Sequence, residues 1–159
     1  MSIQERVGDL FDARGFGALA HGCNCAGAMG AGIAVEFRRR WPQMYEEYKH
    51  RCNAGSFSPG DVFIWPVAGL VIYNFGTQRT WRTKATIEAI GTAAQLMVRD
   101  ARSRGIQAIG LPRIGAGLGG LEWPRVRALL GEVATDGGVR LIVHVLGEKG
   151  TAHGREYRP

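Results

Sequence analysis

Apolar and polar residues follow two different periods along this chain, and each period predicts one kind of element. Between Ile87 and Ala101, apolar residues recur at spacings of three and four, which is typical of a helix with one buried face. Gly105 follows as a favourable place for that helix to end. Residues 106–111 instead form a short, continuous apolar run, typical of a strand covered on both sides. The predicted strands are residues 2–7, 17–21, 61–66, 70–75, 106–111 and 139–146, and the predicted helices are residues 33–41, 42–52, 83–104 and 124–134.

The order of these elements favours one fold class. Strand and helix alternate through most of the chain, and Ala68-Gly69 separates two of the strands as in a hairpin. We therefore predict an α/β protein: a three-layer α/β/α sandwich in which helices cover both faces of a central mixed sheet. The length of 159 residues suits a single domain over residues 1–159, with its core in about residues 2–147 and a tail in residues 148–159.

The charge of the chain favours an acidic partner. A net charge of +6 and an isoelectric point of about 9.7 suit a phosphate-bearing ligand, although a solvated basic surface would explain the same charge. Trp81 lies between Arg79 and Arg82, and aromatic and basic side chains together can bind nucleic acid by stacking on bases and pairing with phosphates. A charge-driven nucleic-acid binder is therefore one of the alternatives.

The cysteines and the amino terminus indicate the compartment. Three cysteines, Cys23, Cys25 and Cys52, are an odd number without a disulfide framework, which favours a reducing environment. The first residues are charged, and no stretch approaches the roughly 20 apolar residues of a membrane helix. We therefore expect a cytoplasmic protein that does not enter a membrane. The cysteine spacing does not fit a metal pair, so we expect neither a metal nor a cofactor.

Two glycine-rich runs carry the candidate chemistry. Residues 24–32 (NCAGAMGAG) and 112–120 (PRIGAGLGG) each follow a predicted strand and precede a predicted helix. Backbone N–H groups of such loops can form a concave anion site, and two loops that face each other would suit a pyrophosphate. Neither run contains the Lys-Ser or Lys-Thr of a Walker motif. The alternative is that these glycines only make tight turns from strand to helix.

The glycine runs belong to a larger pattern. With Gly8-Asp9-Leu10-Phe11 and His21-Gly-Cys-Asn24-Cys, they resemble the macro domain family in order and spacing over residues 7–146. The likeness is closer to the subclass that contains the terminal ADP-ribose glycohydrolase and the bacterial antitoxins that remove ADP-ribose from DNA. Residues 74–82 (NFGTQRTWR) are particularly similar to the antitoxin segment.

This resemblance implies an ADP-ribose site. Asp9 would accept a hydrogen bond from the adenine amino group, with Leu10 beside it and Leu146 also on the adenine side. Asn24 would hold the distal ribose at the scissile bond. The alternatives are that Asp9 caps a turn and that Asn24 braces its own loop. The implied ligand-binding residues are Asp9, Leu10, Asn24, Met29, Gly30, Ala31, Gly32, Ile33, Thr77, Arg113, Ile114, Gly115, Ala116, Gly117, Leu118, Gly119 and Leu146.

Two positions depart from the subclass. Gln78 stands where the subclass has a lysine that attacks the ribose, and Gly119 stands where the human enzyme has an aspartate. Glutamine is not an amine nucleophile, and Lys84 lies six residues further along the chain. We therefore expect a water-based reaction rather than a lysine adduct, with Asn24 and Gln78 as the candidate catalytic residues.

The resulting functional hypothesis is an ADP-ribosyl hydrolase. It would bind ADP-ribose and cleave ADP-ribosyl groups from modified macromolecules, with esters to acidic protein side chains as the easiest bonds to break. The alternatives are a reader that binds ADP-ribose without chemistry and a hydrolase acting on ADP-ribosylated DNA. We expect Arg79, Trp81 and Arg82 to flank the ADP-ribose cleft, where they could contact a DNA-linked substrate. The expected partners are ADP-ribose and ADP-ribosylated protein or DNA, and we expect a monomer.

Overall fold

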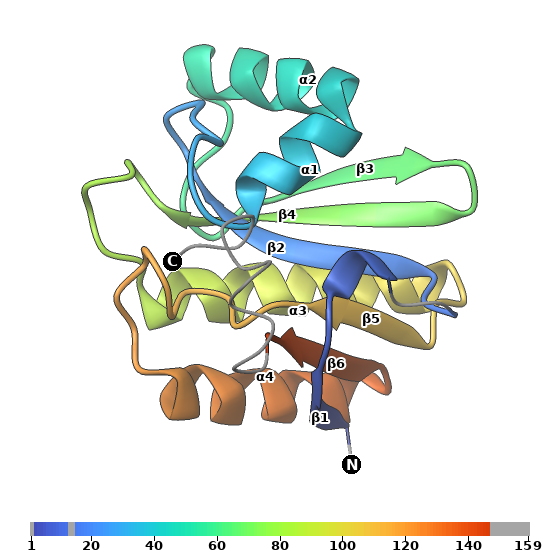
Figure 1. Cartoon of the computed structure of the whole chain (residues 1–159). Coiled ribbons are helices and arrows are strands. Elements are labelled where there is room, and N and C mark those ends of the chain that lie inside the picture. Colours follow the sequence, from blue (N-terminus) through green and yellow to red (C-terminus); the bar gives the residue numbers. More distant parts are fainter. Residues whose placement is uncertain (1, 13–14, 147–159) are drawn as a thin grey trace.

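The protein is described by a computed structural model over residues 2–12 and 15–146. Six strands form one sheet in the order β1-β6-β5-β2-β4-β3, with helices on both of its faces (Figure 1). The strands are β1 (Ile3–Val7), β2 (Ala18–Asn24), β3 (Val62–Val67), β4 (Leu70–Gln78), β5 (Ala108–Leu111) and β6 (Arg140–Val145). The helices are the 3-10 turn η1 (Leu10–Asp12), α1 (Ala34–Arg40), α2 (Pro42–Asn53), α3 (Ile87–Ser103) and α4 (Trp123–Gly137).

The sheet is mixed, as its sequence pattern predicts. β3 and β4 form the antiparallel hairpin, with Val67 opposite Leu70, whereas the other four pairings are parallel. Parallel strands require crossover connections. α4 connects the neighbouring strands β5 and β6, and α3 connects β4 to β5 on the other side of β2. The predicted α/β/α sandwich with a central mixed sheet is confirmed.

The strands β2 and β4 each contribute to two separate cores, because successive side chains point to opposite faces of a sheet. In β2, Ala18 and Ala20 pack into the core under α3 and α4, whereas Leu19 packs into the core under α1 and α2. In β4, Tyr73 and Ile72 divide in the same way. Because the side chains alternate in this way, helices pack on both faces of the sheet, and the site forms at the ends of the strands.

The predicted ends of β2 and β4, at residues 21 and 75, were too early, because each strand continues through the glycine that follows. A Cβ atom on Gly22 would lie 2.9 Å from Cγ2 of Thr77, and one on Gly76 would lie 2.7 Å from the carbonyl oxygen of Ser58. Glycine allows this close packing, so the strands continue to Asn24 and Gln78.

The predicted start of α3 was four residues too early. The hydroxyl of Thr86 accepts a hydrogen bond from the N–H of Ala89 at 3.1 Å and caps the helix, which begins at Ile87. Residues 79–86 therefore form a loop, and Lys84 belongs to this loop rather than to the helix.

The remaining differences concern the carboxyl-terminal half. α4 extends beyond the predicted Ala134 and ends where Gly138 adopts a left-handed conformation at φ 71°. The predicted tail, residues 148–159, lies outside the described residues. Within the described residues, no helix is long and apolar enough to span a membrane.

Candidate functional site

The carboxyl ends of the parallel strands open into one cleft. Parallel strands end at the same edge of a sheet, and ligands of open α/β sheets bind there. The cleft has a volume of about 1210 Å³, above the roughly 300–1,000 Å³ of sites for drug-sized ligands. The glycine loop after β2 and the glycine loop after β5 both line it. The space suits an extended ligand.

Nearly all the predicted site residues line this cleft. Asp9 and Met29 are the two that do not. Met29 is 1% exposed and packs into the core under α1 and α2. The roles assigned to the lining residues remain predictions. The predicted residues in the lining are Leu10, Asn24, Gly30, Ala31, Gly32, Ile33, Thr77, Gln78, Arg113, Ile114, Gly115, Ala116, Gly117, Leu118, Gly119 and Leu146.

Asn24 braces the first glycine loop. Its Nδ2 donates to the carbonyl oxygen of Ala28 at 2.8 Å, and its Oδ1 accepts from the N–H of Ala26 at 2.9 Å. The hydroxyl of the buried Tyr48 donates to the carbonyl oxygen of Asn24 at 2.7 Å and lies 3.0 Å from its Oδ1. The bracing role considered from the sequence is therefore present, and a contact to ribose would be added to it.

The second glycine loop needs at least two of its glycines for packing. A Cβ on Gly115, whose φ is 81°, would lie 2.5 Å from Cδ1 of Ile90. A Cβ on Gly119 would lie 2.6 Å from the carbonyl oxygen of Gly115 and 2.8 Å from Cβ of Ala85. An aspartate at position 119 would therefore require the loop to move.

A carboxylate anchors both ends of this second loop. Glu5 in β1 accepts hydrogen bonds from Arg113 at 3.1 Å and from the indole of Trp123 at 3.2 Å. Arg127 in α4 donates to the same carboxylate at 3.1 Å. Arg113 and Trp123 both line the cleft, whereas Glu5, which binds them, does not.

Gln78 organises the loop that follows β4. The side chain is 7% exposed, and its Nε2 donates to the carbonyl oxygens of Thr80 at 3.0 Å and Thr83 at 2.6 Å. The N–H of Cys25 donates to the carbonyl oxygen of Gln78 at 2.9 Å, which joins this loop to the first glycine loop. The amide nitrogen of Gln78 is therefore committed to the protein, where it holds the loop of residues 79–86.

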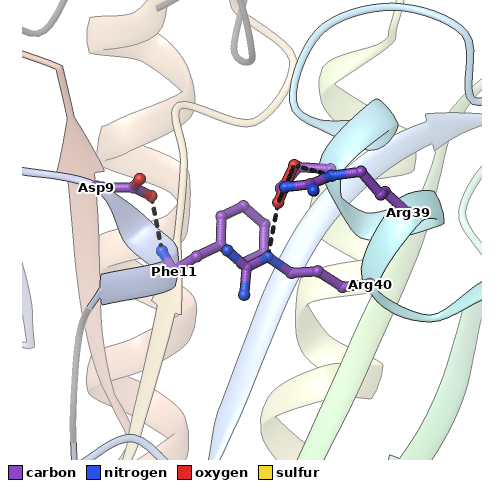
Figure 2. Close-up of polar contacts among 5 residues, drawn as sticks. Asp9, Phe11, Arg39 and Arg40 are labelled. Carbon is purple, nitrogen blue, oxygen red and sulfur yellow. Dashed lines mark hydrogen bonds and ion pairs between the residues drawn. The ribbon is translucent and has the colours of Figure 1, made fainter. Parts of the chain in front are cut away.

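The turn at Asp9 is tied to α1. A carboxylate oxygen of Asp9 accepts from the N–H of Phe11 at 2.9 Å (Figure 2), which is the turn-capping role considered from the sequence. The guanidinium of Arg40 lies 4.5 Å from the centre of the Phe11 ring and pairs with the buried Glu36 at 2.8 Å. The hydrogen bond from Arg39 is the main reason why the pKa of Glu36 lies below its usual value. Asp9 itself lies outside the lining, between Gly8 and Leu10, which are in it.

Sequence reasoning missed several lining residues. His144 and Val145 end β6 directly before Leu146, so the rule that ligands bind at strand ends could have found them. Trp81 was not missed: its place between two arginines led us to expect it beside the cleft, and it lies in the lining. No sequence signal pointed to Trp123. The missed residues are Gly8, Gly22, Cys23, Ala28, Ala34, Pro112, Leu121, Trp123, His144 and Val145.

The described residues offer no obvious metal centre. Among residues 2–12 and 15–146, no group of three or more His, Cys, Asp or Glu side chains is placed to hold a metal ion. The three cysteines are free thiols, and burial is the main reason why the pKa of Cys25 rises to about 12. A protonated thiol is a poor nucleophile, so the site gives Cys25 no role in nucleophilic chemistry.

Comparison with known proteins supplies a family context. The macro domain family model matches residues 20–130. The DNA ADP-ribosyl glycohydrolase of Mycobacterium tuberculosis is 35% identical over 117 residues, which are 71% of this chain and 33% of the relative. The chain thus spans about a third of the length of that relative. The human ADP-ribose glycohydrolase OARD1 is 30% identical over 139 residues, covering 87% of this chain and 88% of the relative.

A solved structure shows the same architecture. The macrodomain of Mycobacterium tuberculosis DarG superimposes with a TM-score of 0.82 at 31% identity. The match covers 91% of this chain and 98% of that one. The similarity therefore extends over nearly the whole described fold, including the strands whose ends form the cleft.

Proposed function

Because the chain belongs to the macro domain family, we propose that its cleft binds ADP-ribose and that the protein releases ADP-ribosyl groups from modified macromolecules by hydrolysis. The observation that carries this proposal is the pair of glycine loops that line one cleft at the strand ends. Their N–H groups can stabilise a pyrophosphate, and each charge-assisted hydrogen bond contributes roughly 1.5–3 kcal/mol. The names of the relatives, which are glycohydrolases of ADP-ribose or ADP-ribosyl DNA, support the same activity.

The ligand would lie along the cleft in one direction. We place the adenine near Leu10 and Leu146, and the pyrophosphate between residues 29–33 and 113–119. The distal ribose then lies at the end where Asn24 and Gln78 line the cleft. The scissile bond would therefore lie beside the loop of residues 79–86.

We expect ADP-ribose to bind at least about tenfold more tightly than AMP, since AMP lacks the second phosphate and the distal ribose. Isothermal titration calorimetry with both ligands measures this difference. Equal affinities would mean that the second phosphate and the distal ribose make no favourable contact with the cleft, which would contradict the proposed placement.

The reaction we propose uses water. Water adds to the anomeric carbon of the distal ribose, the bond to the leaving group breaks, and the leaving group takes up a proton. The pyrophosphate or the ribose hydroxyls of the substrate would position the water, while Asn24 shapes the loop around them. Two features support this: the amide nitrogen of Gln78 is committed to two carbonyl oxygens, and Gly119 leaves no room for a side chain.

We expect no covalent adduct between enzyme and sugar during turnover. Position 78 holds no amine, and Lys84 is exposed and outside the cleft lining. Borohydride trapping followed by intact mass measurement should find only unmodified protein. A trapped adduct on Lys84 would show that lysine chemistry operates by another route.

Two kinds of macromolecule are candidates for carrying the ADP-ribosyl group. An ester to an acidic protein side chain is chemically the easier bond, because a carboxylate is a good leaving group. ADP-ribosylated DNA is supported by the names of the relatives at 35% identity. The test is incubation with both substrates while free ADP-ribose is measured over time. Binding of ADP-ribose without release from either substrate would favour a non-catalytic reader.

A further inference from the structure

An exposed tryptophan stands at the rim of the cleft. Trp81 lines the cleft, yet 59% of it is exposed. The guanidinium of Arg82 lies 4.6 Å from the centre of the Trp81 ring. Tryptophan is enriched at interfaces, because its ring is apolar and its N–H can meet water or a partner, so its exposure within the lining of a site points to a binding surface.

The loop that carries Trp81 is held in place from three sides. Gln78 donates to the carbonyl oxygens of Thr80 and Thr83, as described above. The hydroxyl of Thr80 accepts from the N–H of Arg82 at 3.2 Å, and Thr80 donates from its own N–H to the hydroxyl of Thr83 at 3.0 Å. The N–H of Ala85 donates to the carbonyl oxygen of Gly119 at 3.0 Å. A surface that is already ordered loses little entropy when it binds.

The same loop carries positive charge without nearby compensation. Arg79, Arg82 and Lys84 are exposed, and none of them forms an ion pair with another described residue. No acidic residue lies between Asp61 and Glu88. The loop therefore combines an exposed aromatic ring, over which the guanidinium of Arg82 lies, with two further exposed cations, Arg79 and Lys84.

We propose that Trp81, Arg79, Arg82 and Lys84 form a platform for the single-stranded nucleic acid that carries the ADP-ribosyl group. A base next to the modified nucleotide stacks on Trp81, and the adjacent phosphates pair with the basic side chains. This proposal rests on the proposed function, because the cleft must hold the ADP-ribosyl group of the same molecule. The platform lies at the distal-ribose end, where the macromolecule leaves the cleft.

The chemistry of the platform favours nucleic acid over an acidic peptide. An acidic peptide would use the three cations but gains nothing specific from an exposed aromatic face. A nucleotide uses both groups at once, because its base stacks and its phosphate pairs. A single strand fits better than a duplex, in which the bases are already stacked on one another.

The first test compares two substrates. Trp81→Ala should lower kcat/KM for an ADP-ribosylated single-stranded oligonucleotide about tenfold more than for ADP-ribosylated protein, as expected for the loss of one stacked base. Trp81→Phe should restore most of the oligonucleotide activity. Calorimetry of the variants with free ADP-ribose measures any effect of Trp81 on binding in the cleft itself, and this effect is then distinguished from an effect on the oligonucleotide. Equal losses on both substrates, or a larger loss on the protein, would overturn the platform.

The second test uses salt dependence. For the ADP-ribosylated oligonucleotide, the slope of log K against log salt concentration should fall by about 1.4 in Arg79→Gln/Arg82→Gln, since each phosphate contact of a single strand contributes about 0.7. A matched control is Arg99→Gln/Arg140→Gln, which removes two exposed charges, one late in α3 and one at the opposite end of the sheet. An unchanged slope in the first variant, or an equal change in the control, would overturn the proposal.

The two proposals fail in different ways. If no substrate releases ADP-ribose, hydrolysis is excluded, and fluorescence anisotropy with the same variants still decides the platform. Tighter binding of the modified oligonucleotide than of free ADP-ribose, lost in Trp81→Ala, supports the platform even then. Release of ADP-ribose from the oligonucleotide with no dependence on Trp81 overturns the platform alone.

Discussion

Gly117→Glu is expected to abolish ADP-ribose binding, with affinity falling at least about a hundredfold. Gly117 is exposed in the second glycine loop and lines the cleft. A carboxylate there would face the pyrophosphate, and two like charges about 4 Å apart repel by roughly 4 kcal/mol at an effective dielectric constant of about 20. Calorimetry with ADP-ribose measures the loss.

The backbone at this position tolerates a side chain, so the Gly117→Glu variant should fold. Gly117 does not have a positive φ, unlike Gly115 and Gly120 in the same loop. Gly117→Gln is the matched control, because it adds the same bulk without the charge and should lose less affinity. Circular dichroism checks the fold. A folded Gly117→Glu variant that binds ADP-ribose normally would place the pyrophosphate elsewhere.

The protein is expected to lose about 3 kcal/mol of its free energy of unfolding as the pH falls from about 6.5 to about 4. His21 in β2 is fully buried and stacks on Phe37 with ring centres 3.9 Å apart. Its Nε2 lies 2.6 Å from Oδ1 of Asn74, while its Nδ1 has no hydrogen-bond partner among the described residues. Burial lowers the pKa of His21 from 6.5 to about 4.

The sign of this effect follows from proton binding. Between these two pH values the unfolded chain binds a proton at His21 and the folded protein does not, so protonation favours unfolding. Each unit of pKa difference corresponds to about 1.36 kcal/mol of stability. The stability that neutral His21 contributes is fully present above pH 6.5 and is lost as the pH falls to about 4. Burial also lowers the pKa of His144, which adds a smaller change in the same direction.

Urea unfolding at several pH values tests this in the wild type and in His21→Gln. The variant cannot gain a charge at position 21, so its stability should depend less on pH over this range, whatever its absolute stability. His50→Gln is the matched control, since it removes an exposed histidine of α2 instead of the buried histidine of β2. The same pH dependence in His21→Gln as in the wild type would contradict the assignment.

Local sequence was sufficient to predict the fold class and the edge of the sheet at which the cleft lies. Spacings of three and four predicted α3, and short apolar runs predicted β5 and β6, because these periods follow from backbone geometry alone. The glycine runs could be assigned to one cleft for the same reason: both follow parallel strands, whose carboxyl ends meet at one edge. Element ends were less accurate where glycines such as Gly22 and Gly76 continue a strand to allow close packing.

Only the tertiary structure decided what individual side chains do. Asn24 is braced by Tyr48, which lies 24 residues away in the sequence, and Glu5 holds Arg113 from 108 residues away. Met29 lies within a predicted binding loop but turns into the core, and the amide nitrogen of Gln78 is committed to the loop that carries Trp81. Burial and hydrogen-bond partners arise from contacts between distant segments. A local pattern of residue types therefore determines the elements and their order, whereas the role of each side chain depends on which segments the fold brings together.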